Sequence, residues 1–374
     1  MTVVTFIAGL VLLVAGAELL VRGAAKLALR FGVSSLVVGL TVVAFGTSAP
    51  ELAVSIDSAR RGAVDIAVGN VVGSSIFNVL FILGLCAVVV PLVISRQIIR
   101  QEVPIMIGAS ILLVVLARDG SIGRFDAALF TVLVIAYTTM LVVQSRRAIS
   151  SGKVETEAAS STDLEAEGIS LTSTWDEKVA AQIGLIIGGL ALLILGSRWL
   201  VSSATAFAES LGVSDVVVGL TIVAAGTSMP EVATSVMATI RGHREIAVGN
   251  VIGSNIFNIL MVLGVSGLVA PRPLAVAASI QRFDLWVMLA VAVACLPIFF
   301  TGTRIARWEG GLFVGYYVAY TVYLILDSQD HDALPTYSTV MMLFVVPITV
   351  VTIGIVVARA LKDSRRPGAL APRS

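Results

Sequence analysis

Long apolar runs separated by short polar segments dominate the sequence. About 20 mostly apolar residues are enough to cross a bilayer as an α-helix, and such runs recur along the whole chain. We identify two groups of five runs and one further run, near 3–28, 36–59, 65–90, 99–117 and 125–145, then 179–207, 214–239, 246–270, 284–301 and 309–326, and finally 338–360. The pattern predicts an all-α polytopic membrane protein with eleven transmembrane helices.

One long polar segment separates the two groups. It contains Ser150-Ser151-Gly152 and seven acidic residues, a composition typical of a solvated linker. At about 33 residues it is too short for a folded domain. We therefore expect a first five-helix repeat at 1–145, a polar linker at 146–178, a second five-helix repeat at 179–328, and an extra transmembrane helix with a basic tail at 329–374.

The two groups are copies of one another. Residues 32–78 align with residues 212–258 without a gap, at an offset of 180, and 30 of the 47 positions are identical. Five helices separate each residue from its counterpart, so the two copies enter the membrane from opposite sides. Inverted repeats of this kind build many secondary transporters, whose substrate sites lie at the membrane midplane between the repeats. We therefore expect a ten-helix core of two inverted five-helix repeats.

The distribution of Lys and Arg predicts the orientation. With the N-terminus outside, the inner side collects 18 of the 25 basic residues and the outer side 7. Positive charge is enriched on the cytoplasmic side of membrane proteins. We therefore expect a protein of the cell membrane with its N-terminus outside and its linker and C-terminal tail in the cytoplasm. No basic residue precedes Arg22, which argues against a cleaved signal peptide at the start of the chain.

Composition narrows the functional classes. Only 13% of the 374 residues are charged, against about 25% in an average soluble domain. The net charge of +1 gives no indication of nucleic-acid binding. The sequence contains no recognisable set of nucleophile and base and no metal-binding cluster of histidines. We therefore expect no enzyme activity and no cofactor. The expected partner is the lipid bilayer, with no obligate protein partner.

Each repeat carries the same polar string inside an apolar run. Gly46-Thr47-Ser48-Ala49-Pro50-Glu51 recurs as Gly226-Thr227-Ser228-Met229-Pro230-Glu231. Proline breaks a helix, and we expect the break to free the carbonyls of Ala44 and Ala224. Such carbonyls are tolerated at membrane depth only where protein or a cavity satisfies them, and a bound cation does so directly. A carboxylate at this depth is costly, so Glu51 and Glu231 indicate a functional site.

The next helix of each repeat carries a second string. Gly73-Ser74-Ser75-Ile76-Phe77-Asn78 recurs as Gly253-Ser254-Asn255-Ile256-Phe257-Asn258. Ser74 and Asn78 are four residues apart and share one helix face, as do Ser254 and Asn258. Small and hydroxyl residues also join helices in membranes. That alternative explains the glycines and stays open for the Ser and Thr residues and above all for Asn255, but it does not explain the glutamates.

The available ligand atoms are carboxylate, hydroxyl, amide and carbonyl oxygens. Ca²⁺ takes about 6–8 such oxygens, and similar oxygen cages hold Na⁺. No sulfur or imidazole competes at these positions, which disfavours Zn²⁺ and Cu⁺. The residues alone therefore predict a cation transporter and leave both Ca²⁺ and Na⁺ open. A passive cation channel is an alternative of another class, although two broken helices fit an occluded site better.

The duplicated strings G-T-S-x-P-E and G-N-x-x-G-S-x-I-F-N resemble the alpha-repeats of the sodium/calcium exchanger family, in the cation/Ca²⁺ exchanger superfamily. The resemblance covers roughly residues 1–326. It implies Ca²⁺ transport against a Na⁺ gradient, with four ion sites between the repeats and with both ions as substrates. It also implies an ion site formed by Glu51, Glu231, Thr47, Ser48, Ser74, Asn78, Thr227, Ser228, Ser254 and Asn258, with the carbonyls of Ala44 and Ala224.

Departures within the superfamily refine this expectation. Related Ca²⁺/H⁺ exchangers carry G-N-x-x-E where this chain has G-T-S-x-P-E. Asn at 78 and 258 favours potassium independence, and the short linker indicates a prokaryotic-type member. The resemblance suggests three Na⁺ per Ca²⁺. We expect an electrogenic, potassium-independent Na⁺/Ca²⁺ antiporter that works by alternating access, with Ca²⁺/H⁺ or potassium-dependent exchange as the alternatives.

Other charged residues fall near the ends of the predicted helices. Glu18 precedes Arg22 by one helical turn, and we expect a local ion pair or a headgroup contact there. Asp57 and Asp284 are expected to be rim charges in contact with water, as are Asp65 and Glu245.

Overall fold

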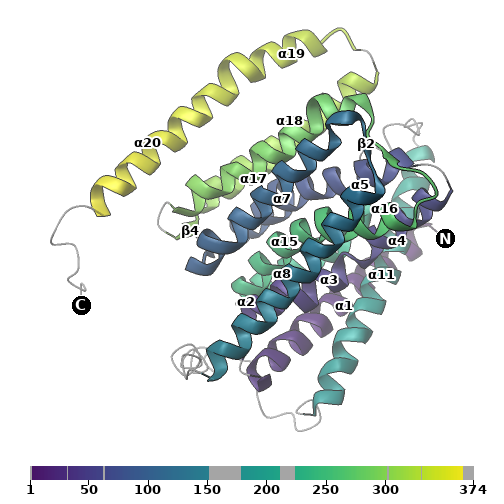
Figure 1. The fold of residues 1–374 in the computed structure, drawn as a ribbon, viewed down its shortest axis with the longest axis vertical. Helices are drawn as coiled ribbons and strands as arrows, with labels where there is room; N and C mark the ends of the chain where they lie inside the picture. The colour runs from purple at the N-terminus through teal and green to yellow at the C-terminus, as the bar shows by residue number, and fades with distance from the viewer. Residues whose placement is uncertain are drawn as a thin grey trace.

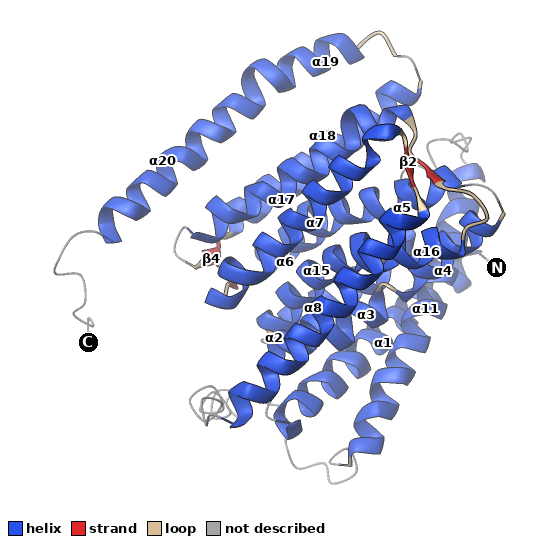
Figure 2. Cartoon of the chain, in the orientation of Figure 1, coloured by secondary structure: helices blue, strands red, loops and turns tan. Residues whose placement is uncertain are grey.

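The computed structural model describes residues 2–31, 33–61, 64–150, 178–210, 224–300, 303–329 and 331–364, and helices dominate them (Figure 1, Figure 2). The labels η mark π-helical segments, except η4, which is a 3₁₀ turn. The first half contains α1 (Thr2–Phe31), α2 (Ser35–Val38), η1 (Gly39–Val43), α3 (Ala44–Thr47), α4 (Ala49–Arg60), α5 (Val64–Phe77), η2 (Asn78–Leu83), α6 (Gly84–Val89), β1 (Leu92–Val93), η3 (Ile98–Glu102), α7 (Val103–Leu116), η4 (Ala117–Asp119), β2 (Ser121–Ile122) and α8 (Arg124–Ser150).

The second half repeats this order. It contains α11 (Val179–Ser210), α13 (Ala224–Thr227), α14 (Met229–Ile240), α15 (Arg244–Phe257), η6 (Asn258–Val262), α16 (Leu263–Val269), β3 (Leu274–Ala275), η7 (Ile280–Asp284), α17 (Leu285–Phe300), β4 (Arg304–Ile305) and α18 (Arg307–Ser328). An extra helical stretch follows, formed by α19 (Leu334–Val340), η8 (Met341–Val345) and α20 (Val346–Ser364).

Ten helical stretches of the described residues are long and apolar enough to cross a membrane. They correspond to ten of the eleven predicted runs, and the last of them, Leu334–Thr352, is the predicted extra helix. The remaining run, 214–239, lies partly outside the described residues, which resume at Ala224 and continue as α13 and α14. The prediction of an all-α polytopic membrane protein is confirmed.

Two short strand pairs relate the halves to one another. β1 pairs with β4 in antiparallel register, with Leu92 opposite Ile305, and β2 pairs with β3, with Ile122 opposite Leu274. β1 and β3 follow the equivalent helices α6 and α16, whereas β2 and β4 precede the equivalent helices α8 and α18. The labelled strands β2 and β4 lie at opposite ends of the helix bundle (Figure 1). Equivalent elements at opposite ends are what inverted repeats require, so this prediction is confirmed.

Each repeat contains one helix that breaks at the proline motif. Ser48 separates α3 from α4 with φ −81° and ψ 5°, and Ser228 separates α13 from α14 with φ −90° and ψ 10°. Pro50 and Pro230 fall in the first turn of the helix that follows. Proline is tolerated there because a first-turn N–H has no partner within the helix. The break therefore lies at the serine, two residues before the proline.

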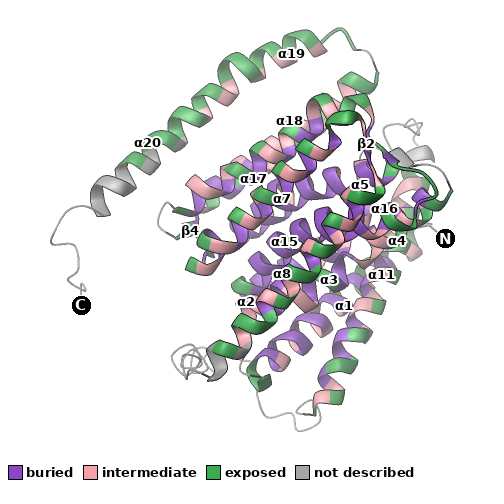
Figure 3. Cartoon of the chain, in the orientation of Figure 1, coloured by how far each residue is buried: buried purple, intermediate pink, exposed green. Residues whose placement is uncertain are grey.

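The centre of the bundle consists of α5 with η2 and α15 with η6. Every residue of α15 from Ile246 to Phe257 is buried (Figure 3). The π-helical segments begin at Asn78 and Asn258, and such segments often mark functional positions within helices. A Cβ atom on Gly253 would lie 2.8 Å from the Cβ of Ala44, so only glycine allows this approach between the repeats.

The extra helix lies at the edge of the bundle. Its stretch α19–α20 lies outside the rest of the bundle (Figure 1), where it contacts α17 and α18, and its described side chains are exposed or half-buried. Two tyrosines link it to α18, because Tyr316 donates to Thr349 Oγ1 at 2.7 Å and Tyr337 donates to the Ala319 carbonyl at 2.8 Å. Its exposed apolar residues, such as Phe344, suit contact with lipid.

Charges near the helix ends agree only in part with the sequence. Asp57 is exposed and pairs with Arg61 at 2.9 Å, as a rim charge would. Asp284 is buried, and Tyr320 donates to its Oδ1 at 2.8 Å, so its expected place at a wet rim is wrong because α18 covers this helix end. Glu18 pairs at 2.9 Å with Arg241, which lies far away in the sequence at the end of α14.

Candidate ion-binding site

Two buried carboxylates occupy equivalent places in the two repeats. Glu51 and Glu231 each lie in the first turn of the helix after the break, and neither side chain is exposed. Ser228 donates from Oγ to Oε1 of Glu51 at 3.0 Å, and Ser48 donates from Oγ to Oε1 of Glu231 at 3.4 Å. Each carboxylate is therefore held by a serine of the other repeat, so the two broken helices meet.

The charge of this pair is only partly compensated. The two carboxylates repel one another, and the Oε2 atom of each has no hydrogen-bond partner among the described residues. The amino-terminal ends of α4 and α14 stabilise negative charge next to them. An unpaired buried carboxylate still costs several kcal/mol of desolvation on the order-of-magnitude scale for ions in proteins. A cation between Glu51 and Glu231 would offset this cost.

The predicted serines and asparagines of the following helices are also buried. Ser74 Oγ lies 3.2 Å from Ser228 Oγ and so joins the group around Glu51. Asn78 uses its amide nitrogen in a hydrogen bond, but its Oδ1 has no partner among the described residues. The same holds for Ser254 Oγ and for both polar side-chain atoms of Asn258. Buried polar atoms without partners are rare, and a bound ion is one explanation for a group of them.

The backbone at the break differs from the simple expectation. The carbonyl of Ala44 accepts the N–H of Ser48 at 3.1 Å and the hydroxyl of Thr47 at 3.4 Å, so the break does not leave it free. Pro50 and Pro230 have no N–H, so the carbonyls that lose a helical donor are those four residues earlier, of Gly46 and Gly226. Ala224 begins the described part of α13.

The two predicted threonines bind asparagines of the other repeat. Thr47 donates to Oδ1 of Asn250 at 3.0 Å, and Thr227 lies 3.4 Å from Oδ1 of Asn70 in the equivalent arrangement. These contacts cross between repeats in both directions. These contacts connect each broken helix to the central helix of the other repeat.

Asn70 and Asn250 were not among the predicted site residues. The amide of Asn70 also donates to Ser55 Oγ at 3.1 Å and to the Glu51 carbonyl at 3.3 Å, while Asn250 donates to Ser235 Oγ at 2.9 Å. Each asparagine therefore ties the glutamate-bearing helix of its own repeat to the threonine of the other. Their recurrence in the string Gly-Asn-Val at the offset of 180 was the signal that could have identified them.

Comparison with known proteins identifies the family of this chain. The family model described as "Sodium/calcium exchanger protein" matches residues 1–143 and 181–326. The chain belongs to this family. The residues matched by the family model leave out the whole predicted linker and the whole extra helix.

The similarity to individual relatives extends over nearly the whole length of each relative. The putative antiporter CaxA of Alkalimonas amylolytica is 37% identical over 325 residues, which cover 86% of this chain and 98% of CaxA. The sodium/calcium exchanger MaX1 of Methanosarcina acetivorans is 36% identical over 343 residues, covering 84% and 96% of the two chains. A solved structure of the sodium-calcium exchanger NCX_Mj, soaked with 2.5 mM Na⁺ and 0.1 mM Ca²⁺, superposes with a TM-score of 0.70 at 29% identity, covering 85% and 96%.

The candidate site does not have the ligand residues of a typical structural or catalytic metal centre. No group of three or more His, Cys, Asp or Glu residues that could hold a metal occurs in the described part of the chain. The candidate site instead combines two carboxylates with neutral hydroxyl and amide oxygens. Oxygen atoms of these kinds are the ligands that hard cations such as Ca²⁺ take.

Proposed function

We propose that this protein is a Na⁺/Ca²⁺ antiporter that works by alternating access. The observation that carries the proposal is the reciprocal contact of Ser228 with Glu51 and of Ser48 with Glu231. The carboxylates sit where the two inverted repeats meet, and a movement of one repeat against the other changes which side of the membrane reaches them. MaX1 and NCX_Mj, which carry the name sodium/calcium exchanger, support this function.

Ca²⁺ and Na⁺ compete for one set of oxygens in this proposal. Both ions accept carboxylate, hydroxyl, amide and carbonyl ligands, and two carboxylates balance the charge of one Ca²⁺. The proposed ligands are Glu51, Glu231, Thr47, Ser48, Ser74, Asn78, Thr227, Ser228, Ser254 and Asn258, with the carbonyls of Ala44 and Ala224. The carbonyl of Ala44 would bind an ion in place of the long hydrogen bond that it accepts from Thr47. Because the ions exclude one another, each outward step with one ion is followed by a return with the other.

The exchange is proposed to be electrogenic and independent of K⁺. Glu51 and Glu231 supply two negative charges, while the buried amides of Asn78 and Asn258 are neutral. One Ca²⁺ leaves such a site neutral, whereas three Na⁺ leave it at +1. An aspartate at position 258 would add the third charge that a further K⁺ needs.

We propose an orientation with the N-terminus outside the cell, as the distribution of basic residues favours. The linker at 146–178 and the tail after the extra helix are then cytoplasmic, and 1–145 and 179–328 are the two transport repeats. We assign no catalytic activity and no cofactor to the chain, because its chemistry is the binding and release of ions.

Uptake of ⁴⁵Ca²⁺ into proteoliposomes tests the proposal. Vesicles loaded with Na⁺ and diluted into Na⁺-free buffer should accumulate Ca²⁺, whereas vesicles loaded with choline should not. Uptake without internal Na⁺ would indicate a channel. Uptake that follows an imposed pH gradient, or that requires K⁺ together with Na⁺, would replace the proposed coupling with one of the alternative exchange reactions.

A further inference from the structure

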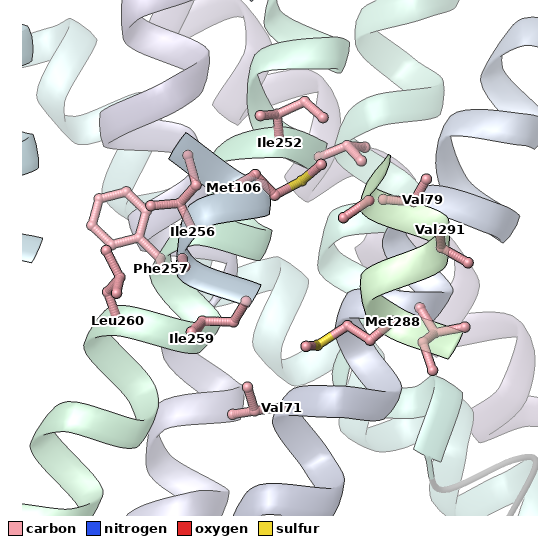
Figure 4. Close-up of a cluster of buried hydrophobic side chains, with 14 of the residues drawn as sticks. Val71, Val79, Met106, Ile252, Ile256, Phe257, Ile259, Leu260, Met288 and Val291 are labelled. Atoms are coloured by element: carbon pink, nitrogen blue, oxygen red, sulfur yellow. The ribbon is translucent and has the colours of Figure 1, made fainter. Parts of the chain in front are cut away.

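A chain of three buried side chains connects α7 to the candidate ion site. Asn78 donates from Nδ2 to Oδ1 of Asn255 at 3.1 Å, and Asn255 donates from Nδ2 to Sδ of Met106 at 3.4 Å. All three side chains are buried. In Figure 4, Met106 lies next to Ile252 and Ile256 of α15, the helix that carries Asn255.

The sulfur of Met106 determines how both amides are oriented. A thioether accepts a hydrogen bond weakly and has no hydrogen to donate. The NH₂ end of Asn255 must therefore face Met106, and its carbonyl oxygen must face Asn78. Asn78 must then turn its own NH₂ group toward Asn255. Its Oδ1, which has no other partner among the described residues, is left to face the ion.

The reverse orientation is disfavoured on electrostatic grounds. If both amides were flipped, the carbonyl oxygen of Asn255 would lie against the sulfur lone pairs of Met106. The amide NH₂ of Asn78 would then face the ion site, where it would repel a cation and leave the carboxylates with one oxygen fewer. A methionine outside the ion site thus selects the ligand atom that Asn78 offers.

Among the described residues, Asn258 has no equivalent arrangement. Ser75 occupies the position equivalent to Asn255, and its hydroxyl donates to the Val71 carbonyl of its own helix at 2.8 Å. Met288 follows Asp284 by four residues, as Met106 follows Glu102. The counterpart of Asn255 here is Ser75, which has no amide to orient. Both side-chain polar atoms of Asn258 lack partners among the described residues. The two site asparagines are therefore unequal, because Asn78 is held by a hydrogen bond through its amide nitrogen and Asn258 is not.

We propose that Met106 and Asn255 are positioning residues that fix the side-chain oxygen of Asn78 toward the transported cation. The inference rests on the proposed function and deepens it, because it assigns specificity for cations to residues that do not touch the ion. Met106 and Asn255 act by orienting the amide of Asn78 and do not contact the ion themselves. Removing the acceptor at position 106 should lower the affinity for Ca²⁺ without lowering the stability of the fold.

The test uses Met106→Leu in the full-length protein, with Met288→Leu as the matched control. Leucine conserves the volume of methionine but cannot accept a hydrogen bond. The half-saturating Ca²⁺ concentration for Na⁺-driven uptake should rise about two- to tenfold in Met106→Leu, the range that corresponds to one hydrogen bond. Maximal uptake and the melting temperature of the ion-free protein should change little. Met288→Leu should match the wild type in all three measurements.

Two further variants separate orientation from packing. Met106→Gln supplies an amide oxygen as the acceptor and should bring the half-saturating Ca²⁺ concentration back toward the wild-type value. Asn255→Ser reproduces the residue of the other repeat and should raise that concentration as Met106→Leu does. If Met106→Leu does not yield folded protein, Asn255→Ser and Met106→Gln decide the question by the same measurement.

The inference is overturned if folded Met106→Leu and Asn255→Ser keep the wild-type half-saturating Ca²⁺ concentration. It is also overturned if both variants show a lower melting temperature and a lower maximal uptake with an unchanged half-saturating Ca²⁺ concentration, since that result indicates a role in packing. Failure of the proposed function looks different, because the wild-type protein itself would then show no Na⁺-driven uptake. In that case the shift of melting temperature with added Ca²⁺ still compares binding among the same variants.

Discussion

Glu51→Gln is the most direct test of the site, since it removes one of the two buried charges and little else. The glutamine keeps a side-chain oxygen that can accept the hydrogen bond now donated by Ser228 at 3.0 Å. Ser48 and Glu231 are not altered. The contact between the repeats should therefore persist, while the charge that faces a cation falls by half.

The expected loss of Ca²⁺ affinity follows from Coulomb's law. At about 4 Å and an effective dielectric constant of about 20, a unit charge and a divalent ion interact by roughly 8 kcal/mol. The dipole of the glutamine oxygen recovers part of this energy, and the variant no longer has to bring two like charges together. If only about 3 kcal/mol is lost, the half-saturating Ca²⁺ concentration rises roughly hundredfold.

The assay compares Glu51→Gln with the wild type in Na⁺-driven ⁴⁵Ca²⁺ uptake and in the shift of melting temperature with added Ca²⁺. Glu102→Gln is a matched control, because Glu102 is also fully buried in a transmembrane helix but binds Tyr137, Gln97 and Gln101 instead. That control should keep the wild-type Ca²⁺ affinity. A folded Glu51→Gln protein within threefold of the wild type would refute the assignment of the carboxylate.

Four further predictions address coupling and architecture. At a fixed Na⁺ gradient, Ca²⁺ flux should depend on a membrane potential clamped with valinomycin, because moving one charge across the membrane is worth about 2.3 kcal/mol per 100 mV. A flux that does not change with the clamped potential means electroneutral exchange. Asn258→Asp should introduce sensitivity of Ca²⁺ uptake to K⁺ or pH, and unchanged sensitivity to both argues against Asn258 as a ligand. A chain that ends after Ser328 should retain Na⁺-driven uptake in the same vesicles, since the extra helix packs mainly against α17 and α18 at the edge of the described bundle. Loss of uptake by folded protein contradicts this. Gly253→Ala should destabilise the protein by about 1–3 kcal/mol in thermal unfolding, because its methyl group would meet Ala44 at 2.8 Å.

The sequence predicts the framework well because each element has a local signal. Hydropathy alone locates the spans, since any helix in lipid must be apolar over its length. The offset of 180 and the odd number of intervening helices then give the inverted halves. Pro50 and Pro230 mark the broken helices within two residues, because the steric effect of proline is local.

The partners of individual polar groups could not be predicted in the same way. Thr47 and Asn250 are 203 residues apart in sequence, and only the packing of the two repeats brings them within 3.0 Å. Asp284 has the sequence context of a rim charge, yet Tyr320 of another helix covers it. A local pattern gives the face on which a side chain lies, but it does not give the residue that this side chain meets.

The differences between the two copies bear on the relative energy of the two facing states in the proposed mechanism. Pro230 deprives the Gly226 carbonyl of its helical donor, and the hydroxyl of Ser197 replaces that donor at 2.6 Å. The equivalent position in the first repeat is Ala17, which has no hydroxyl, so Gly46 cannot be satisfied in this way. If the repeats exchange roles as the carrier turns, a perfectly symmetric pair would make its two end states equal in energy. The hydroxyl of Ser197 is one difference that removes this equality. In the proposed mechanism, the preference for one facing state would therefore be set by differences between the repeats rather than by the residues they share.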